Sequence, residues 1–299
     1  MPSGTPTNRT NITLPAEMSE KILATMQTES AVMQLAQQIR LPGKGVEIPV
    51  ITSDPTAAWV AETGSKPVSN PGLTSKLMTA YKLAVIVPFS NEFRRDAAAL
   101  YDELVRRLPR ALAQKFDETV FGTTLTRPGS NFDVFGSCTA QNIGSTNTYA
   151  GIVAADLDIA THGGIMNGIA LSPQGKSTLL AAKDNDGRPL FINNISEGAV
   201  PIVLGAKTVL SKGAYVAGSP NTVGVAGDWT QAFYGTVEGI KIDYSSDASL
   251  VVNESTTINL FQQNMFAVRA EIEVGFRANT DCFNKLTVAA SGGSSSSAS

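Results

Sequence analysis

Four consecutive residues of this chain resemble the end of a phosphate-binding loop. Gln174-Gly175-Lys176-Ser177 carries the order in which backbone amides and a lysine hold nucleotide phosphates. That loop needs a second glycine five positions before Gly175, where Ala170 stands, and Pro173 presets a backbone unlike a ring of amide donors. We therefore interpret the segment as the start of a helix with Ser172 as its N-cap.

The other reactive side chains form no recognisable catalytic or metal-binding cluster. His162 is the only histidine, so a Ser-His-Asp system would have to use it, and no Gly-x-Ser-x-Gly elbow supplies the serine. Cys138 and Cys282 have neither metal spacing nor a disulfide framework, which favours two free thiols. Three carboxylate pairs lack a supporting motif and are interpreted as solvated: Asp156/Asp158, Asp184/Asp186 and Glu271/Glu273. We predict no catalytic residue, no cofactor and no metal.

The composition is that of a globular chain with few charges. Hydrophobic residues make up 42% of the 299 residues and charged residues 16%, below the usual share. A surface with few charges suits a protein that hides much of itself against neighbours. The net charge of -3 argues against electrostatic DNA binding by the whole chain. No apolar run approaches the roughly 20 residues of a membrane helix, so no membrane segment is expected.

The N-terminal third of the chain is predicted to hold a helix, a strand and a long polar hairpin. Residues 17–40 have helical spacing, and Thr28 or Ser30 is a candidate N-cap that would divide the helix. Residues 46–51 are predicted as a strand. A polar loop rich in Gly, Pro and Ser, 62–75, precedes an extended segment, 77–89. The hairpin lacks an alternating apolar face and cannot build a core of its own.

Residues 91–122 are the clearest helix of the sequence. Its apolar residues recur every four positions along one face: Leu100, Leu104, Leu108, Leu112, Phe116 and Val120. Pro109 lies inside this ladder and predicts one kinked helix rather than two. The same helix carries five arginines, and pairing with nearby acidic residues is favoured over contact with DNA: Arg94, Arg95, Arg106, Arg107 and Arg110.

The remainder of the chain mixes short helices and strands. Helices are predicted at 156–163 and from Ser172 to about residue 183, with a turn at 184–189. Strands are predicted at 165–171, 200–204, 208–210, 222–226, 234–244 and 257–282. Within the last segment, 259–271 fits a helix as well as a strand. The tail 291–299 is of low complexity, and the whole pattern predicts an α+β fold.

Seven segments follow one another in an order known from one family. They are the Gly-x-x-x-x-Ile-Pro strand (43–51), Trp-Val-Ala-Glu (59–62), the return strand (82–92), the long helix (91–122), the Asp-x-x-Gly-Arg-Pro turn (184–191), Gly-Asp-Trp (227–229) and the closing segment (259–277). In this order they resemble the major capsid proteins of tailed bacteriophages that share the Hong Kong 97 fold.

The resemblance implies a domain plan. It comprises an N-terminal arm with short helices and a lead-in strand (1–50), an extended β-hairpin loop (51–90), a peripheral domain with the spine helix (91–150) and return strands (235–290), an axial domain (151–234) and a flexible tail (291–299). Inter-subunit contact is implied for loop residues Trp59, Glu62, Lys66 and Lys76. An axial-domain turn is implied for Asp184, Gly187, Arg188 and Pro189.

The same resemblance implies a structural function. Hexamers and pentamers of the chain would form an icosahedral shell around double-stranded DNA, without sequence-specific DNA binding. The shell would be assembled in the host bacterial cytoplasm and become the virion capsid, without a membrane. A separate scaffolding protein, a portal and a decoration protein are the further partners expected.

Three alternatives remain beside this interpretation. An encapsulin uses the same fold to enclose an enzyme, but its helical N-terminus differs from the polar residues 2–13 of this chain. A hydrolase with an unrecognised site would need a reactive cluster that the sequence lacks. A secreted adhesion module is disfavoured by the missing signal sequence and the two unpaired cysteines.

Overall fold

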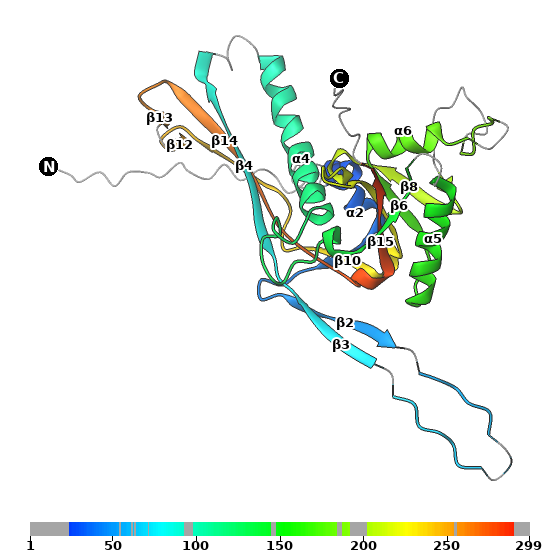
Figure 1. Cartoon of the computed structure of the whole chain (residues 1–299). Coiled ribbons are helices and arrows are strands. Elements are labelled where there is room, and N and C mark those ends of the chain that lie inside the picture. The colour runs from blue at the N-terminus through cyan, green and yellow to red at the C-terminus, as the bar shows by residue number, and fades with distance from the viewer. Residues whose placement is uncertain are drawn as a thin grey trace, which may run out of the picture.

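The structure is a computed structural model that describes residues 24–53, 55–60, 62, 64–70, 72–92, 98–144, 148–183, 187–191, 202–253 and 256–289. The expectations for the N-terminal arm, the Gly/Ser tail, Asp184, Arg94 and Arg95 lie outside these residues. The chain has the predicted mixed α+β architecture, with two sheets, helices between and beside them, and a long hairpin (Figure 1). No helix in the described part is both long and apolar enough to cross a membrane.

The N-terminal segment is only partly the predicted helix. Residues 24–29 are helical, and helix α2 (Ala31–Leu35) begins at Ser30, whose hydroxyl accepts a hydrogen bond from the Met33 amide at 3.2 Å. The predicted division at Ser30 is therefore confirmed. The helix predicted to reach residue 40 is wrong after Leu35, because β1 (Gln37–Arg40) pairs in parallel with β10 (Ala232–Thr236). Backbone pairing with a distant strand overrides the helical spacing.

Helix α4 (Ala98–Phe121) is continuous through Pro109, as predicted. The predicted ladder is buried from Leu108 onward, through Leu112, Phe116 and Val120, whereas the side chains of Leu100 and Leu104 are not described. The bend at Pro109 stays a prediction. Arg110 pairs with Glu29 of the N-terminal segment at 2.9 Å, rather than with an acidic residue of its own helix.

A five-stranded sheet lies beside α4 (Figure 1). Its centre is the 14-residue strand β14 (Met265–Ala278), which pairs antiparallel with β10, β11 (Lys241–Ser245) and β4 (Tyr81–Ser90). The ambiguous residues from 265 onward are therefore a strand, and the predicted strand 234–244 divides into β10 and β11. The hairpin β12 (Ser249–Asn253) and β13 (Thr256–Asn259) precedes β14.

A six-stranded sheet forms the second body of the fold. Its order is β5 (Thr139–Asn142), β15 (Phe283–Val288), β9 (Asn221–Gly227), β6 (Gly168–Leu171), β8 (Ala206–Leu210) and β7 (Ile202–Val203). One face packs on α5 (Thr148–Thr161) and α6 (Pro173–Ala181), and the opposite face joins the core around α2 and α4. Two apolar cores therefore share one sheet.

The two helices on this sheet test the local sequence signals. The Ser172 hydroxyl accepts a hydrogen bond from the Gly175 amide at 3.0 Å, so the phosphate-loop resemblance is a capped helix start, as interpreted. Helix α5 begins eight residues earlier than the predicted 156. Gly151 lies in the first turns of this helix. Its lack of a Cβ allows the helix to pack closely on β5, since a Cβ there would collide with the backbone of Asn142. A glycine that signals a loop in sequence thus serves close packing here.

One buried carboxylate joins the N-terminal segment, α4 and the six-stranded sheet. Asp117 of α4 is fully buried and accepts hydrogen bonds from the Ser30 hydroxyl (2.5 Å), the Ala31 amide (2.9 Å) and the Ser211 hydroxyl (2.6 Å). Ser211 directly follows β8. A Cβ on Gly213, in the short helix η3 (Lys212–Ala214), would lie 2.8 Å from the Asp117 Cβ. The joint is therefore tightly packed around Asp117.

Burial sets the protonation of this carboxyl group. It raises the pKa of Asp117 from 3.8 to about 6, and hydrogen bonds from Ser211, Ser30, Ala31 and Val32 offset part of that effect. Because the pKa is higher in the folded than in the unfolded chain, the group stabilises the fold at acidic pH. This contribution is lost as the pH rises through about 6.

Replacing Asp117 by Asn tests this pH dependence. The amide oxygen keeps the hydrogen bonds from Ala31 and Ser211, and the NH2 group donates to Ser30. The variant loses the long 3.4 Å bond from the Val32 amide but has no charge to bury. Relative to the wild type, Asp117→Asn should gain up to about 3 kcal/mol of unfolding free energy between pH 4 and pH 7. Urea unfolding of free subunits at several pH values measures the difference. A difference that does not change with pH would contradict the assignment.

The ladder of α4 yields a second stability prediction. Leu112 is buried against the central core, so Leu112→Ala should lower the unfolding free energy by about 2–5 kcal/mol. Leu112→Met keeps most of the volume and should cost less than about 1.5 kcal/mol. Denaturant unfolding of both variants provides the measurement, and equal costs would show that the position is not packed as described.

Candidate functional site and assembly surfaces

The most prominent surface feature is the β2–β3 hairpin, which projects from the body of the molecule (Figure 1). Strands β2 (Val46–Ser53) and β3 (Gly72–Met78) pair antiparallel from Val46↔Met78 to Ser53↔Gly72. Beyond the ladder, the Thr56 amide donates to the Ser69 hydroxyl at 2.8 Å. A hairpin is present, but its bounds differ from the predicted 51–90. The predicted extended segment 77–89 divides between β3 of the hairpin and β4, which pairs with β14 instead.

The four loop residues expected at subunit contacts lie in two different places. Trp59, Glu62 and Lys66 are on the exposed outer part of the hairpin, and the Trp59 side chain is fully exposed. Lys76 lies near the base, where its ammonium donates to the Ala278 carbonyl at 2.8 Å and lies 3.4 Å from Asp133. Lys76 therefore acts within its own subunit in this structure.

A buried arginine fastens the hairpin base to the body. Arg277 of β14 donates to the Leu77 carbonyl (2.8 Å), the Asp133 carboxylate (2.9 Å) and the Asn131 amide oxygen (2.9 Å). The other Asp133 oxygen accepts from the Ala278 amide at 3.1 Å. Each of the three guanidinium nitrogens of Arg277 donates a hydrogen bond, and the Asp133 carboxylate lies beside the buried charge. The hairpin thus begins from a rigid base.

Two opposed glycines allow the hairpin base to sit close to the sheet. Gly235 of β10 pairs with Gly275 of β14. A Cβ on Gly235 would lie 2.5 Å from the Leu41 side chain, and one on Gly275 would lie 2.6 Å from the Thr79 carbonyl. Leu41 and Met78 fill this notch with Ile48 in a small separate core. Sequence reasoning missed the notch, and its signal was a glycine inside each strand pattern.

The Gly-Asp-Trp segment connects the two sheets. Between β9 and β10, the Asp228 carboxylate accepts hydrogen bonds from the Asn167 amide group (2.9 Å) and the Thr230 hydroxyl (2.6 Å). The Trp229 indole donates to the Gly168 carbonyl at 2.9 Å and packs edge-on against Phe135 and Phe283, whose rings contact each other. The segment is a structural joint.

The predicted axial turn is an exposed loop. Gly187 adopts the left-handed backbone with a φ of 81°, and Pro189 bridges back to Lys183. Arg188 is exposed. These contacts agree with the turn expected from the composition, while Asp184 lies outside the described residues.

The side chains considered for catalysis are not brought together. His162 is exposed, and its Nδ1 lies 2.8 Å from the backbone carbonyl of Asp158. Cys138 and Cys282 are free and buried, and burial raises the pKa of the Cys138 thiol to about 12. That shift disfavours a reactive thiolate. In the described ranges, no group of three or more His, Cys, Asp or Glu side chains could hold a metal ion.

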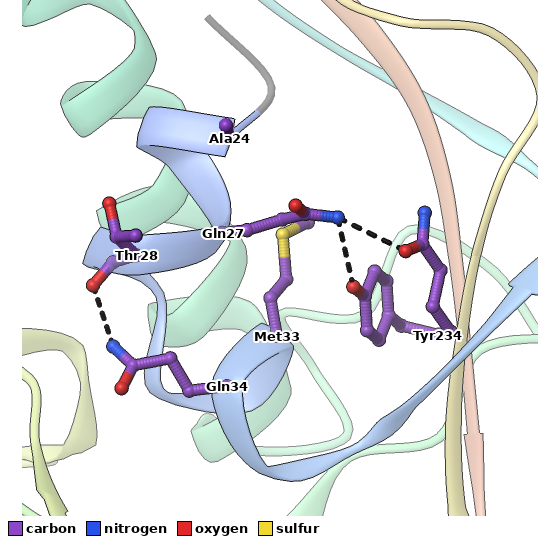
Figure 2. Close-up of a pocket in the computed structure, with 7 residues that line it drawn as sticks. Ala24, Gln27, Thr28, Met33, Gln34 and Tyr234 are labelled. Atoms are coloured by element: carbon purple, nitrogen blue, oxygen red, sulfur yellow. Dashed lines mark hydrogen bonds between the residues drawn. The ribbon is translucent and has the colours of Figure 1, made fainter. Parts of the chain in front are cut away.

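An open cleft of about 430 Å³ lies between the N-terminal helical residues, α2 and β10 (Figure 2). The Gln27 amide donates to the Tyr234 hydroxyl (3.3 Å) and to the Gln38 side chain (3.1 Å) across it. Met33 and Gln34 complete much of the lining. This lining holds no His, Cys, Lys or carboxylate side chain, and the Tyr234 hydroxyl is engaged by the Gln27 amide, so it has the character of a polar surface cleft.

Two kinds of sequence comparison agree on the family. The family model described as "Phage capsid family" matches residues 10–282. The "Probable major capsid protein gp17" of Mycobacterium phage D29 is 30% identical over 297 residues, which cover 94% of this chain and 91% of that protein. The "Major capsid protein" of Staphylococcus phage 80alpha is 27% identical over 291 residues, with 93% and 85% covered.

Solved structures share the fold over most of the chain. A chain of Microbacterium phage Oxtober96 aligns with a TM-score of 0.70 and 21% identity, covering 87% of this chain and 91% of that one. The capsid of the native GTA particle, solved with C5 symmetry, aligns with a TM-score of 0.61 and 14% identity, covering 97% and 95%.

The family model matches residues 10–282, which is most of the sequence, and a curated major capsid protein is 30% identical over 94% of this chain. The chain therefore belongs to the phage capsid family, and it is a structural protein of a bacteriophage virion rather than an enzyme.

Proposed function

We propose that hexamers and pentamers of this chain build an icosahedral shell around packaged double-stranded DNA, and that the β2–β3 hairpin of each subunit reaches over a neighbour. The observation that carries the proposal is the exposed Trp59 on a hairpin that projects from the body (Figure 1). The encapsulin alternative is disfavoured, because the sequence relatives are bacteriophage capsid proteins.

Exposure of the hairpin tip is the physical argument for a partner. Trp59 and Val68 both present apolar side chains to solvent, and aromatic anchors of this kind carry much of the binding energy at interfaces. The hydrogen bonds of Arg277 fix the base of the hairpin to the body, so the hairpin leaves the body at a defined position. Each contact needs only modest strength, since many repeated contacts in a shell hold by avidity.

We assign the two bodies of the fold to the two expected domains. The five-stranded sheet and α4 correspond to the peripheral domain, and the six-stranded sheet with α5 and α6 corresponds to the axial domain. Strands β5 and β15 pair within the six-stranded sheet, which supports moving them from the peripheral to the axial side. Likewise, β10 supports a boundary at 228–231 rather than after 234.

The remaining partners stay predictions. A scaffolding protein, a portal and a decoration protein are implied by the resemblance alone. DNA is expected to be enclosed without sequence readout, because the net charge of the chain is -3. Arg110, one of the arginines of α4, forms an ion pair with Glu29.

Truncating the hairpin tip tests the proposed contact. Trp59→Ala should lower the yield of closed shells severely while leaving the unfolding temperature of free subunits unchanged, because the side chain is fully exposed. Negative-stain images and sedimentation measure assembly. Leu125→Ala removes another exposed apolar side chain outside the hairpin and should assemble normally. Normal shells at normal yield from Trp59→Ala would contradict the proposal.

Hydrogen exchange tests the same contact without a substitution. The backbone amides of residues 55–60 and 64–70 lie outside regular strands and are expected to exchange rapidly in free subunits. In assembled shells the same amides should be protected, whereas those of β14 should be protected in both states. Strong protection of the tip in free subunits would count against an ordering role for the neighbour.

A further inference from the structure

Helix α5 carries apolar side chains on a buried face and on a separate exposed face. Its inner face packs on the six-stranded sheet through Ile152, Ala155 and Ile159. Its outer face carries a stripe, which we call the α5 stripe, at a spacing of four residues: Tyr149, Val153 and Leu157, exposed by 53%, 40% and 65%. A surface helix normally turns polar residues outward, and one that is apolar all round is normally covered on both sides.

A second apolar patch lies at the far edge of the same sheet. It consists of Ile202 and Leu204, exposed by 64% and 46%, on the short edge strand β7 and the turn to β8, and we call it the β7 edge. Leu204 has a φ of 48° and Gly205 a φ of 83°. Asn or Gly tolerates such a turn with less strain than leucine. The left-handed backbone and the solvent exposure of Leu204 both cost free energy in an isolated subunit. A binding partner for the leucine side chain would offset that cost.

The two patches lie toward opposite edges of one sheet. The α5 helix packs on β5, β15 and β9, whereas β7 closes the other end of the order β5-β15-β9-β6-β8-β7. A subunit can therefore use one patch for each of two neighbours. Two different patches on one subunit are what a head-to-tail ring requires, since a two-fold contact would need one self-complementary patch.

Charges beside the patches are also complementary. Asp156 is exposed on α5 next to the stripe, and Lys207 is exposed on β8 directly opposite Ile202 in the ladder. Opposite charges at the rim of an apolar contact favour its register and disfavour wrong pairings.

We propose that the α5 stripe of one subunit packs against the β7 edge of the next copy, head to tail, around each ring of the shell. This inference rests on the proposed function, which supplies a second copy as the occupant. The same fold occurs in a capsid solved with C5 symmetry, an arrangement in which head-to-tail contacts close. Leu157 and Leu204 are the expected anchors, with Asp156 and Lys207 at the rim.

A charge exchange tests the pairing directly. Leu157→Glu and Leu204→Lys should each reduce the yield of rings and shells at least tenfold, because each places a charge in an apolar contact. The chain with both substitutions should recover assembly, because every interface then joins Glu from one copy to Lys from the next. Leu157→Met is the matched control and should assemble like the wild type. Sedimentation and negative-stain images provide the yields, and thermal unfolding confirms that each subunit folds.

A further variant separates strain from contact. Leu204→Asn relieves the left-handed backbone but removes the apolar side chain. Free subunits of this variant should unfold at the same or a higher temperature than the wild type, while their assembly falls as with Leu204→Lys. Normal assembly of Leu204→Asn would show that the side chain has no partner and would overturn the proposal.

The remaining outcomes distinguish this inference from the proposed function. Wild-type shells together with normal assembly of either single charge variant would overturn the head-to-tail contact alone. A double variant that stays as defective as the single variants would do the same. Recovery in a mixture of Leu157→Glu and Leu157→Lys chains, without recovery of the double variant, would assign α5 to a two-fold contact instead. A wild-type chain that stays monomeric would contradict both the proposed function and this inference.

Discussion

The buried carboxylate of Asp117 is the interaction on which the arrangement of this fold depends. A single side chain receives hydrogen bonds from the start of α2 and from the segment after β8, so α4 is tied to both at one point. Burying it is unfavourable, as the raised pKa shows, and a joint made of apolar groups alone would avoid that cost. The carboxylate makes the packing specific, because its oxygens accept hydrogen bonds only from donors placed at defined positions around them. The relative placement of the two sheets follows from this joint and from the Asp228–Trp229 joint beside it.

The same division between strong internal joints and exposed outer surfaces recurs at the hairpin. Arg277 and Asp133 hold its base with buried, charge-assisted hydrogen bonds, and the notch at Gly235 and Gly275 lets Leu41 and Met78 pack closely. Among the described residues of the outer hairpin, the Thr56 amide donates to the Ser69 hydroxyl. A segment built in this way keeps its direction without a partner, but it does not bury its aromatic side chain until a partner arrives. That property suits a subunit that folds alone and becomes stable in a lattice through many modest contacts.

The exposed apolar groups of the described residues have a physical explanation in a shell protein. The sequence has few charges, and the structure places large apolar side chains at the hairpin tip, on α5 and at the β7 edge, three sites on different elements. A monomeric protein would carry an aggregation risk from such surfaces. In the proposed shell, neighbouring copies of the subunit would cover these surfaces.

Local signals in the sequence determined the elements whose causes lie within one or two turns. Ser30 and Ser172 cap helices where predicted, and the ladder from Leu108 marks α4. The polar composition of residues 62–75 marks the outer part of the hairpin, although residues 72–75 belong to β3. The resemblance of ordered motifs also identified the family. Only the tertiary structure decided the features that need a distant partner. Residues 37–40 form a strand because they pair with β10, which lies some 200 positions away in sequence. The close packing of α5 on β5 at Gly151 likewise depends on a contact between separate elements. Asp117 and Arg277 could be seen as charged residues within apolar patterns, but their partners lie as many as 94 and 200 positions away. No periodicity within a single element encodes such pairings, because the chain brings those partners together only when the two sheets pack.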